Sequence, residues 1–69
     1  MSNSNVKIQS TSHGVRVIDV NIGDIIRIYT TDGVLHHYER ADSQTIDIPL
    51  TKNDVYIIKV GGKTAKIRY

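Results

Sequence analysis

The residues of this sequence best suited to chemistry are two adjacent histidines, His36 and His37. Neutral imidazole nitrogens are common metal ligands. Neighbouring residues of a β-strand point to opposite faces, so two such rings would share a metal ion only if folding brought a third ligand, such as His13, close to one of them. We therefore predict surface histidines, no metal site and no cofactor.

The other polar residues do not form a recognisable catalytic pattern. The seven acidic residues mostly occupy expected turns or solvent-facing strand positions, where Asp32 and Asp54 are typical turn formers that accept local backbone hydrogen bonds. Paired-carboxylate catalysis needs a cleft, and a chain of 69 residues has little volume for one. No serine lies in a nucleophile motif, no glycine pattern resembles a phosphate loop, and there is no cysteine. We expect no catalytic residues and a protein that is not an enzyme.

The elements that position these residues are predicted to be short strands. Apolar residues recur with a period of two, as in Tyr56, Ile58 and Val60, which alternate with Val55, Ile57 and Lys59. The expected strands cover residues 6–9, 15–19, 25–30, 34–40, 43–50, 55–60 and 64–69. Seven short strands with turns about every 8–12 residues predict an all-β sandwich or barrel. Of the two we expect a small seven-stranded antiparallel β-sandwich of immunoglobulin-like type.

Glycine and proline residues make three specific predictions. Gly33 is expected to supply a positive φ in a tight hairpin, and Gly61-Gly62 is expected to join the last two strands. Pro49 cannot donate to a ladder, so its strand should lie at an edge or end there. Around residues 15–20 the alternation is broken, which indicates either a bulge near Ile18-Asp19 or a strand covered on both faces.

The alternation also predicts a hydrophobic core, in which Tyr56 and Tyr69 are buried rings. The predicted core consists of Val6, Ile8, Val17, Ile26, Ile28, Leu35, Ile46, Ile48, Leu50, Tyr56, Ile58, Val60, Ala65 and Ile67.

Charge argues for a mixed, solvated surface. Nine basic and seven acidic residues give a formal net charge of +2, and the one local excess is Lys63, Lys66 and Arg68. Tyr29 and Tyr38 flank one turn and are expected to touch. Since most of the charge is interspersed and no basic stripe is apparent, we expect no binding of nucleic acid.

The chain is expected to hold one domain. Residues 1–5 are polar and predict a disordered linker or a remnant left by excision from a longer parent, and residues 6–69 form the sandwich. No apolar run reaches the roughly 20 residues of a membrane helix, and no signal peptide is visible.

Two segments resemble the C-terminal sorting domains of the Por (type IX) secretion system and related C-terminal β-sandwich domains of bacterial surface proteins. The first has Ile28-Tyr29 followed by Gly33 and Leu35. The second has Leu50, then Val-Tyr-Ile-Ile-Lys-Val over residues 55–60, then Lys63. The sequence departs from the family at residues 53–54, where Asn-Asp replaces the usual glycine before Val-Tyr.

The resemblance implies a non-catalytic sorting or anchoring domain attached to an upstream cargo domain of a secreted or cell-surface protein of a Gram-negative bacterium. Such a parent would pass through the periplasm, and the partner would be the secretion or anchoring machinery of the outer membrane. The expected recognition surface is Lys63, Lys66, Arg68 and Tyr69. Two alternatives remain: an accessory adhesion or carbohydrate-binding module that uses Tyr29 and Tyr38, or a structural spacer without a ligand.

Overall fold

A computed structural model describes residues 5–51 and 54–69 of the chain. Most of the predicted linker, residues 1–4, lies outside the described residues, as does Asn53 of the turn in which the sequence departs from the sorting domains.

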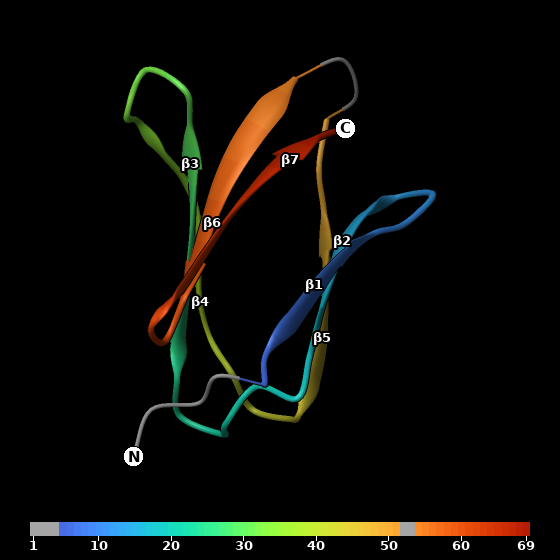
Figure 1. Ribbon diagram of the computed structural model, residues 1–69, viewed down its shortest axis with the longest axis vertical. Coiled ribbons are helices and arrows are strands. Elements are labelled where there is room, and N and C mark those ends of the chain that lie inside the picture. The colour runs from blue at the N-terminus through green and yellow to red at the C-terminus, as the bar shows by residue number, and fades with distance from the viewer. Residues whose placement is uncertain (1–4, 52–53) are drawn as a thin grey trace.

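The described chain is a two-layer antiparallel sandwich, which confirms the predicted fold class (Figure 1). Its strands are β1 (Lys7–Ser10), β2 (Gly14–Ile18), β3 (Ile25–Thr30), β4 (Leu35–Arg40), β5 (Thr45–Pro49), β6 (Val55–Val60) and β7 (Lys63–Arg68). One sheet has the order β1-β2-β5 and the other β4-β3-β6-β7. The described residues include no helix that is long and apolar enough to cross a membrane.

The turns follow the chemistry of their residues. Gly33 (φ 87°) lies between β3 and β4, and Gly61 (φ 57°) begins the two-residue connection of β6 to β7, so both predicted hairpins are confirmed. β5 ends at Pro49 and is an edge strand, also as predicted. The irregularity after Val17 has a simple cause: β2 ends at Ile18, and Asp19 adopts a left-handed conformation (φ 63°) that allows Val20 to be buried as well.

The core lies between the sheets and largely matches the prediction. Buried apolar side chains are Val6, Val15, Val17, Val20, Ile26, Ile28, Ala41, Ile46, Ile48, Tyr56, Ile58 and Val60, with Ile8, Leu50, Ile67 and Tyr69 partly buried against them. The prediction missed Val15, Val20 and Ala41, and Ala65 is only half-buried. Tyr56 is buried, and its hydroxyl donates to the Thr51 carbonyl oxygen at 3.2 Å.

A bulge in β4 overturns two predictions at once. Ile28 pairs with His37 but Tyr29 pairs with Leu35, which leaves His36 as an extra residue in β4. An extra residue reverses the facing of every side chain beyond it. Leu35 is therefore 49% exposed, and the prediction that it belongs to the core was wrong.

The same bulge places His36 and His37 on one side of the sheet, so the prediction of opposite facing was wrong. His37 lies across from the buried Ile28, and the His36 ring centroid is 5.0 Å from that of the buried Tyr56. Opposite facing of the two rings is therefore no reason to expect that a metal site is absent.

Candidate recognition surface

The outer side of the four-stranded sheet gathers positive charge from all four strands. Its outward positions are Ile25, Arg27 and Tyr29 of β3, Leu35, Tyr38 and Arg40 of β4, Val55, Ile57 and Lys59 of β6, and Thr64, Lys66 and Arg68 of β7. Five of the nine basic residues of the chain stand among them: Arg27, Arg40, Lys59, Lys66 and Arg68. We call these five residues, with Tyr29 and Tyr38, the basic sheet face.

No carboxylate occupies an outward position of these four strands, all of which the structure describes. The one acidic residue within them, Glu39, lies across from the buried Ile26 and so faces the other way. The expectation that no basic stripe exists was therefore wrong. The sequence contains the signal, because Arg27, Lys59 and Lys66 are each out of phase with the core residues of their strands.

The two tyrosines of the face lie against its cations. The Arg27 guanidinium carbon is 5.6 Å from the ring centroid of Tyr38, and the Lys59 Nζ is 5.6 Å from that of Tyr29. Both distances are within the range of cation–π attraction. The sequence led us to expect contact between the two rings. In the structure Tyr38 lies across from Arg27 and Tyr29 lies across from Leu35, so the two tyrosines are not direct cross-strand partners.

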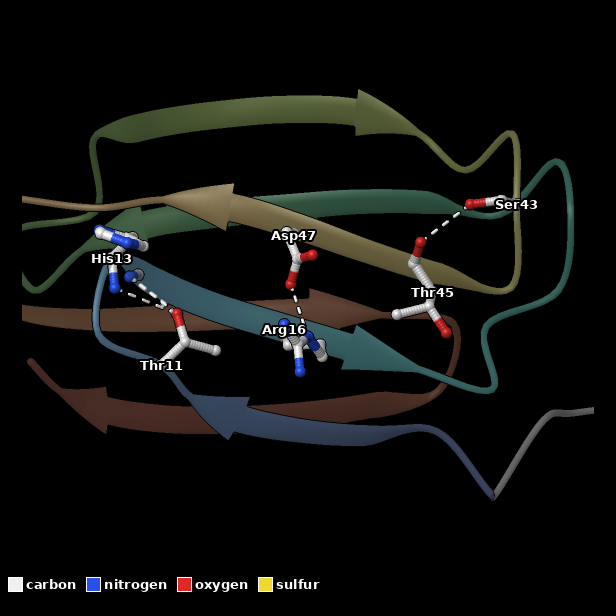
Figure 2. Close-up of polar contacts among 7 residues, drawn as sticks. Thr11, His13, Arg16, Ser43, Thr45 and Asp47 are labelled. Atoms are coloured by element: carbon white, nitrogen blue, oxygen red, sulfur yellow. Dashed lines mark hydrogen bonds and ion pairs between the residues drawn. The ribbon is translucent and has the colours of Figure 1, made fainter.

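The three-stranded sheet carries a different surface. Arg16 of β2 and Asp47 of β5 are cross-strand partners, and Arg16 Nε donates to Asp47 Oδ1 at 2.7 Å (Figure 2). An exposed cation neutralised by its neighbour leaves little net field. Unpaired positive charge is therefore concentrated on the four-stranded sheet, at the basic sheet face, rather than on the three-stranded sheet.

The expected recognition residues at the end of the chain fall into two groups. Lys66 and Arg68 are exposed and lie across from Ile57 and Val55, on the outer side of the sheet. Lys63 lies across from the buried Val60 and so starts β7 on the other side. Tyr69 is half-buried against the core, and its backbone N–H donates to the Asp54 carbonyl oxygen at 2.9 Å.

The inner side of the edge strand β4 holds the other polar cluster. His37 Nε2 and Glu39 Oε1 are 2.9 Å apart. Both side chains are part-exposed, because the three-stranded sheet is narrower than the four-stranded sheet and leaves the inner side of this edge strand partly uncovered. Within residues 5–51 and 54–69 no group of three or more histidine, cysteine or acidic side chains is placed to hold a metal ion. Inward-pointing charge and a bulge are both features that protect an edge strand from pairing with another chain.

The β3–β4 turn contains a carboxylate with a shifted proton affinity. The Thr30 hydroxyl donates to Asp32 Oδ1, and the backbone amides of Asp32 and Val34 add to its effect, so the pKa of the Asp32 carboxyl lies below its ordinary value of 3.8. A hydrogen-bonded carboxylate of this kind is a turn-forming device, as the sequence predicted for this residue.

This lowered pKa predicts a pH dependence. A carboxyl whose pKa is lower in the folded state stabilises the fold above its unfolded pKa and loses that contribution as pH falls through the folded pKa. We expect Asp32→Asn to be less stable than the parent at pH 7, and the difference to shrink as pH falls below 3.8 and through the folded pKa. Denaturation at pH 7 and at several pH values below 3.8 measures this, and an NMR titration that finds the Asp32 pKa at or above 3.8 would contradict it.

Fold and surface together define a small antiparallel β-sandwich domain with a basic, tyrosine-bearing sheet face. Comparison of the chain with protein-family models, curated proteins and solved structures finds no match.

Proposed function

We propose that this chain is a non-catalytic sorting or anchoring domain of a larger bacterial cell-surface protein, and that it acts by protein–protein recognition. The observation that supports the proposal is that the two sides of β7 have different surroundings, one exposed to solvent and the other packed against the core. Its outward residues Lys66 and Arg68 are exposed, whereas Ile67 between them packs against the core. One strand can therefore complete the fold with one side and present charge to a receptor with the other.

The open edge of β7 adds a second element of recognition. Among the described strands β7 pairs only with β6, at the end of the four-stranded sheet, so one row of its backbone groups faces away from that sheet. Exposed edges accept a partner strand in many peptide-recognition complexes. A receptor strand beside β7 would lie next to Lys66 and Arg68, which would set its charge preference.

Export of a reporter protein fused to this domain tests the proposal. In a host with the type IX machinery we expect the reporter to reach the cell surface, and Lys66→Ala with Arg68→Ala to reduce export several-fold at unchanged stability, because exposed charges contribute little to folding. Lys7→Ala with Arg16→Ala removes the same two charges from the other sheet and is the matched control.

Ile67→Asp tests the contribution of the inward side of β7 to folding. This change buries an unpaired charge, so we expect loss of both the folded state and export. Normal export of the Lys66/Arg68 variant would exclude this surface as the receptor site. If the reporter is retained although the domain is folded, the proposal is wrong and the adhesion-module and spacer alternatives remain.

A further inference from the structure

The basic sheet face has features that recognition of a protein strand at the β7 edge does not use. Arg27, Lys59 and Tyr38 lie in one cross-strand row, and the row ends at Thr64 rather than at a charged residue. Tyr38 is 56% exposed although a large ring is costly to leave in water. The next row holds Tyr29, Ile57 and Lys66, so positively charged and apolar side chains occupy adjoining rows of the face.

Two adjoining hollows mark the part of this face near the β3–β4 turn. One, of about 330 Å³, is lined by Tyr29, Thr30, Thr31, Gly33, Ile57 and Lys59. The other, also about 330 Å³, is lined by Thr31, Val55, Lys66 and Arg68. Both hollows include Thr31 in their lining, so they lie next to each other, and we refer to the two together as the trough. Such a trough is too open to enclose a small molecule, which is usually buried over most of its surface, but it suits a flexible chain that lies across the strands.

We propose that the basic sheet face binds single-stranded nucleic acid. Proteins that bind single strands without sequence preference combine a positive surface for the phosphates with aromatic side chains on which bases stack. Bases also stack on arginine guanidinium planes, and the Arg27–Tyr38 contact places both kinds of platform side by side. The absence of carboxylates from the outward positions removes the repulsion that a polyanion would otherwise meet.

This choice among polyanions rests on the aromatic rings. An acidic polysaccharide would use the cations but would gain no base stacking from Tyr29 and Tyr38. Duplex DNA would present its phosphates but keep its bases inside the stack. The proposal goes beyond the sorting role and does not depend on it. The two surfaces share Lys66 and Arg68, but Arg27, Lys59 and Tyr38 lie outside the surface assigned to the receptor.

Fluorescence anisotropy with a labelled twelve-residue oligothymidylate tests the inference. If three or four phosphates are contacted, the dissociation constant should rise about 20- to 50-fold between 50 and 200 mM salt. Tyr38→Ala should weaken binding at least about 5-fold through lost stacking. Arg27→Gln with Lys59→Gln should reduce the slope of log affinity against log salt by about 1.4, since each phosphate contact contributes about 0.7.

Matched controls keep the inference open to refutation. Lys7→Gln with Arg16→Gln makes the same change of net charge on the other sheet and should leave both affinity and slope unchanged. Circular dichroism of each variant verifies folding, and Tyr38→Phe should retain binding because it keeps the ring. The proposal would be overturned if polygalacturonate or a duplex of the same length bound as tightly as the oligothymidylate and Tyr38→Ala left the affinity unchanged. The face would then be a general surface for polyanions. Absence of any salt-dependent binding would overturn the proposal as well.

Discussion

Replacing Ile58 by alanine is expected to lower the free energy of unfolding by about 2–5 kcal/mol. Ile58 lies in the middle of β6 with none of its surface exposed, and its cross-strand partners are Ile28 of β3 and Ala65 of β7. The substitution removes buried methyl and methylene groups and leaves a cavity that the two surrounding sheets fill only in part. Total stabilities of small domains are of the same order, so much of the population should unfold.

Urea denaturation followed by circular dichroism measures this effect. Ile22→Ala is the matched control, because Ile22 is the same residue type but 69% exposed. We expect the control to differ from the parent by no more than about 0.5 kcal/mol, as is usual for surface sites. An equally small change for Ile58→Ala would mean that the inward and outward faces of β6 have been exchanged.

The prediction for Ile58 depends on information that is already present in the sequence. Lys59 is out of phase with Tyr56, Ile58 and Val60 and so indicates the inward face, the glycine pair after Val60 indicates the turn, and the structure has both. Local patterning is sufficient here because β6 is a central strand of its sheet with no insertion, so its period of two runs unbroken from end to end.

β4 shows where local patterning is insufficient. Its residues Leu35, His37 and Glu39 have the same phase in the sequence, yet the extra residue His36 moves Leu35 to the outer side. A bulge is a property of the pairing between two strands. No pattern within one of them reveals it, and the mistaken facing of the histidines has the same origin.

The basic sheet face illustrates a second kind of non-local information. Each of Arg27, Lys59 and Lys66 appears in the sequence as an isolated solvent-facing charge. Their assembly depends on the strand order β4-β3-β6-β7, which brings together segments that β5 and its two connections separate in the chain. Phase alone could have shown that the basic residues of these strands other than Lys63 share the outward side, once one sheet was assumed to contain them.

Gly14→Ala is expected to destabilise the domain by at least about 3 kcal/mol, at the upper end of the range for overpacked sites. Gly14 begins β2 and pairs with Pro49 at the end of β5. A Cβ atom there would lie 2.0 Å from the Ile48 carbonyl oxygen, 2.7 Å from the Leu50 nitrogen and 2.8 Å from the Pro49 Cα. All three are backbone atoms, so no side-chain rotation relieves the clash and the two strands must separate.

Separation of these strands would break more than one contact. The Leu50 N–H donates to the His13 carbonyl oxygen, and the Thr11 hydroxyl accepts from the Gly14 N–H at 3.1 Å, so the β1–β2 turn is fastened to β5 at this point. The Thr11 side chain and its bonds to this turn are visible in Figure 2. We therefore expect loss of the Leu50 amide's protection from hydrogen exchange together with the drop in stability.

Gly62→Ala is the matched control for this effect. Gly62 is also a hairpin glycine, but a Cβ atom there meets no atom within 4 Å, and its φ is not in the left-handed region. The control should change the free energy of unfolding by less than about 0.5 kcal/mol. If Gly14→Ala proved as mild as Gly62→Ala, β2 and β5 could not approach each other as closely as the structure requires. The three-stranded sheet would then have to be paired in another way, with Gly14 displaced from Pro49 and the side chains of Val15 and Val17 no longer closing the core from that side.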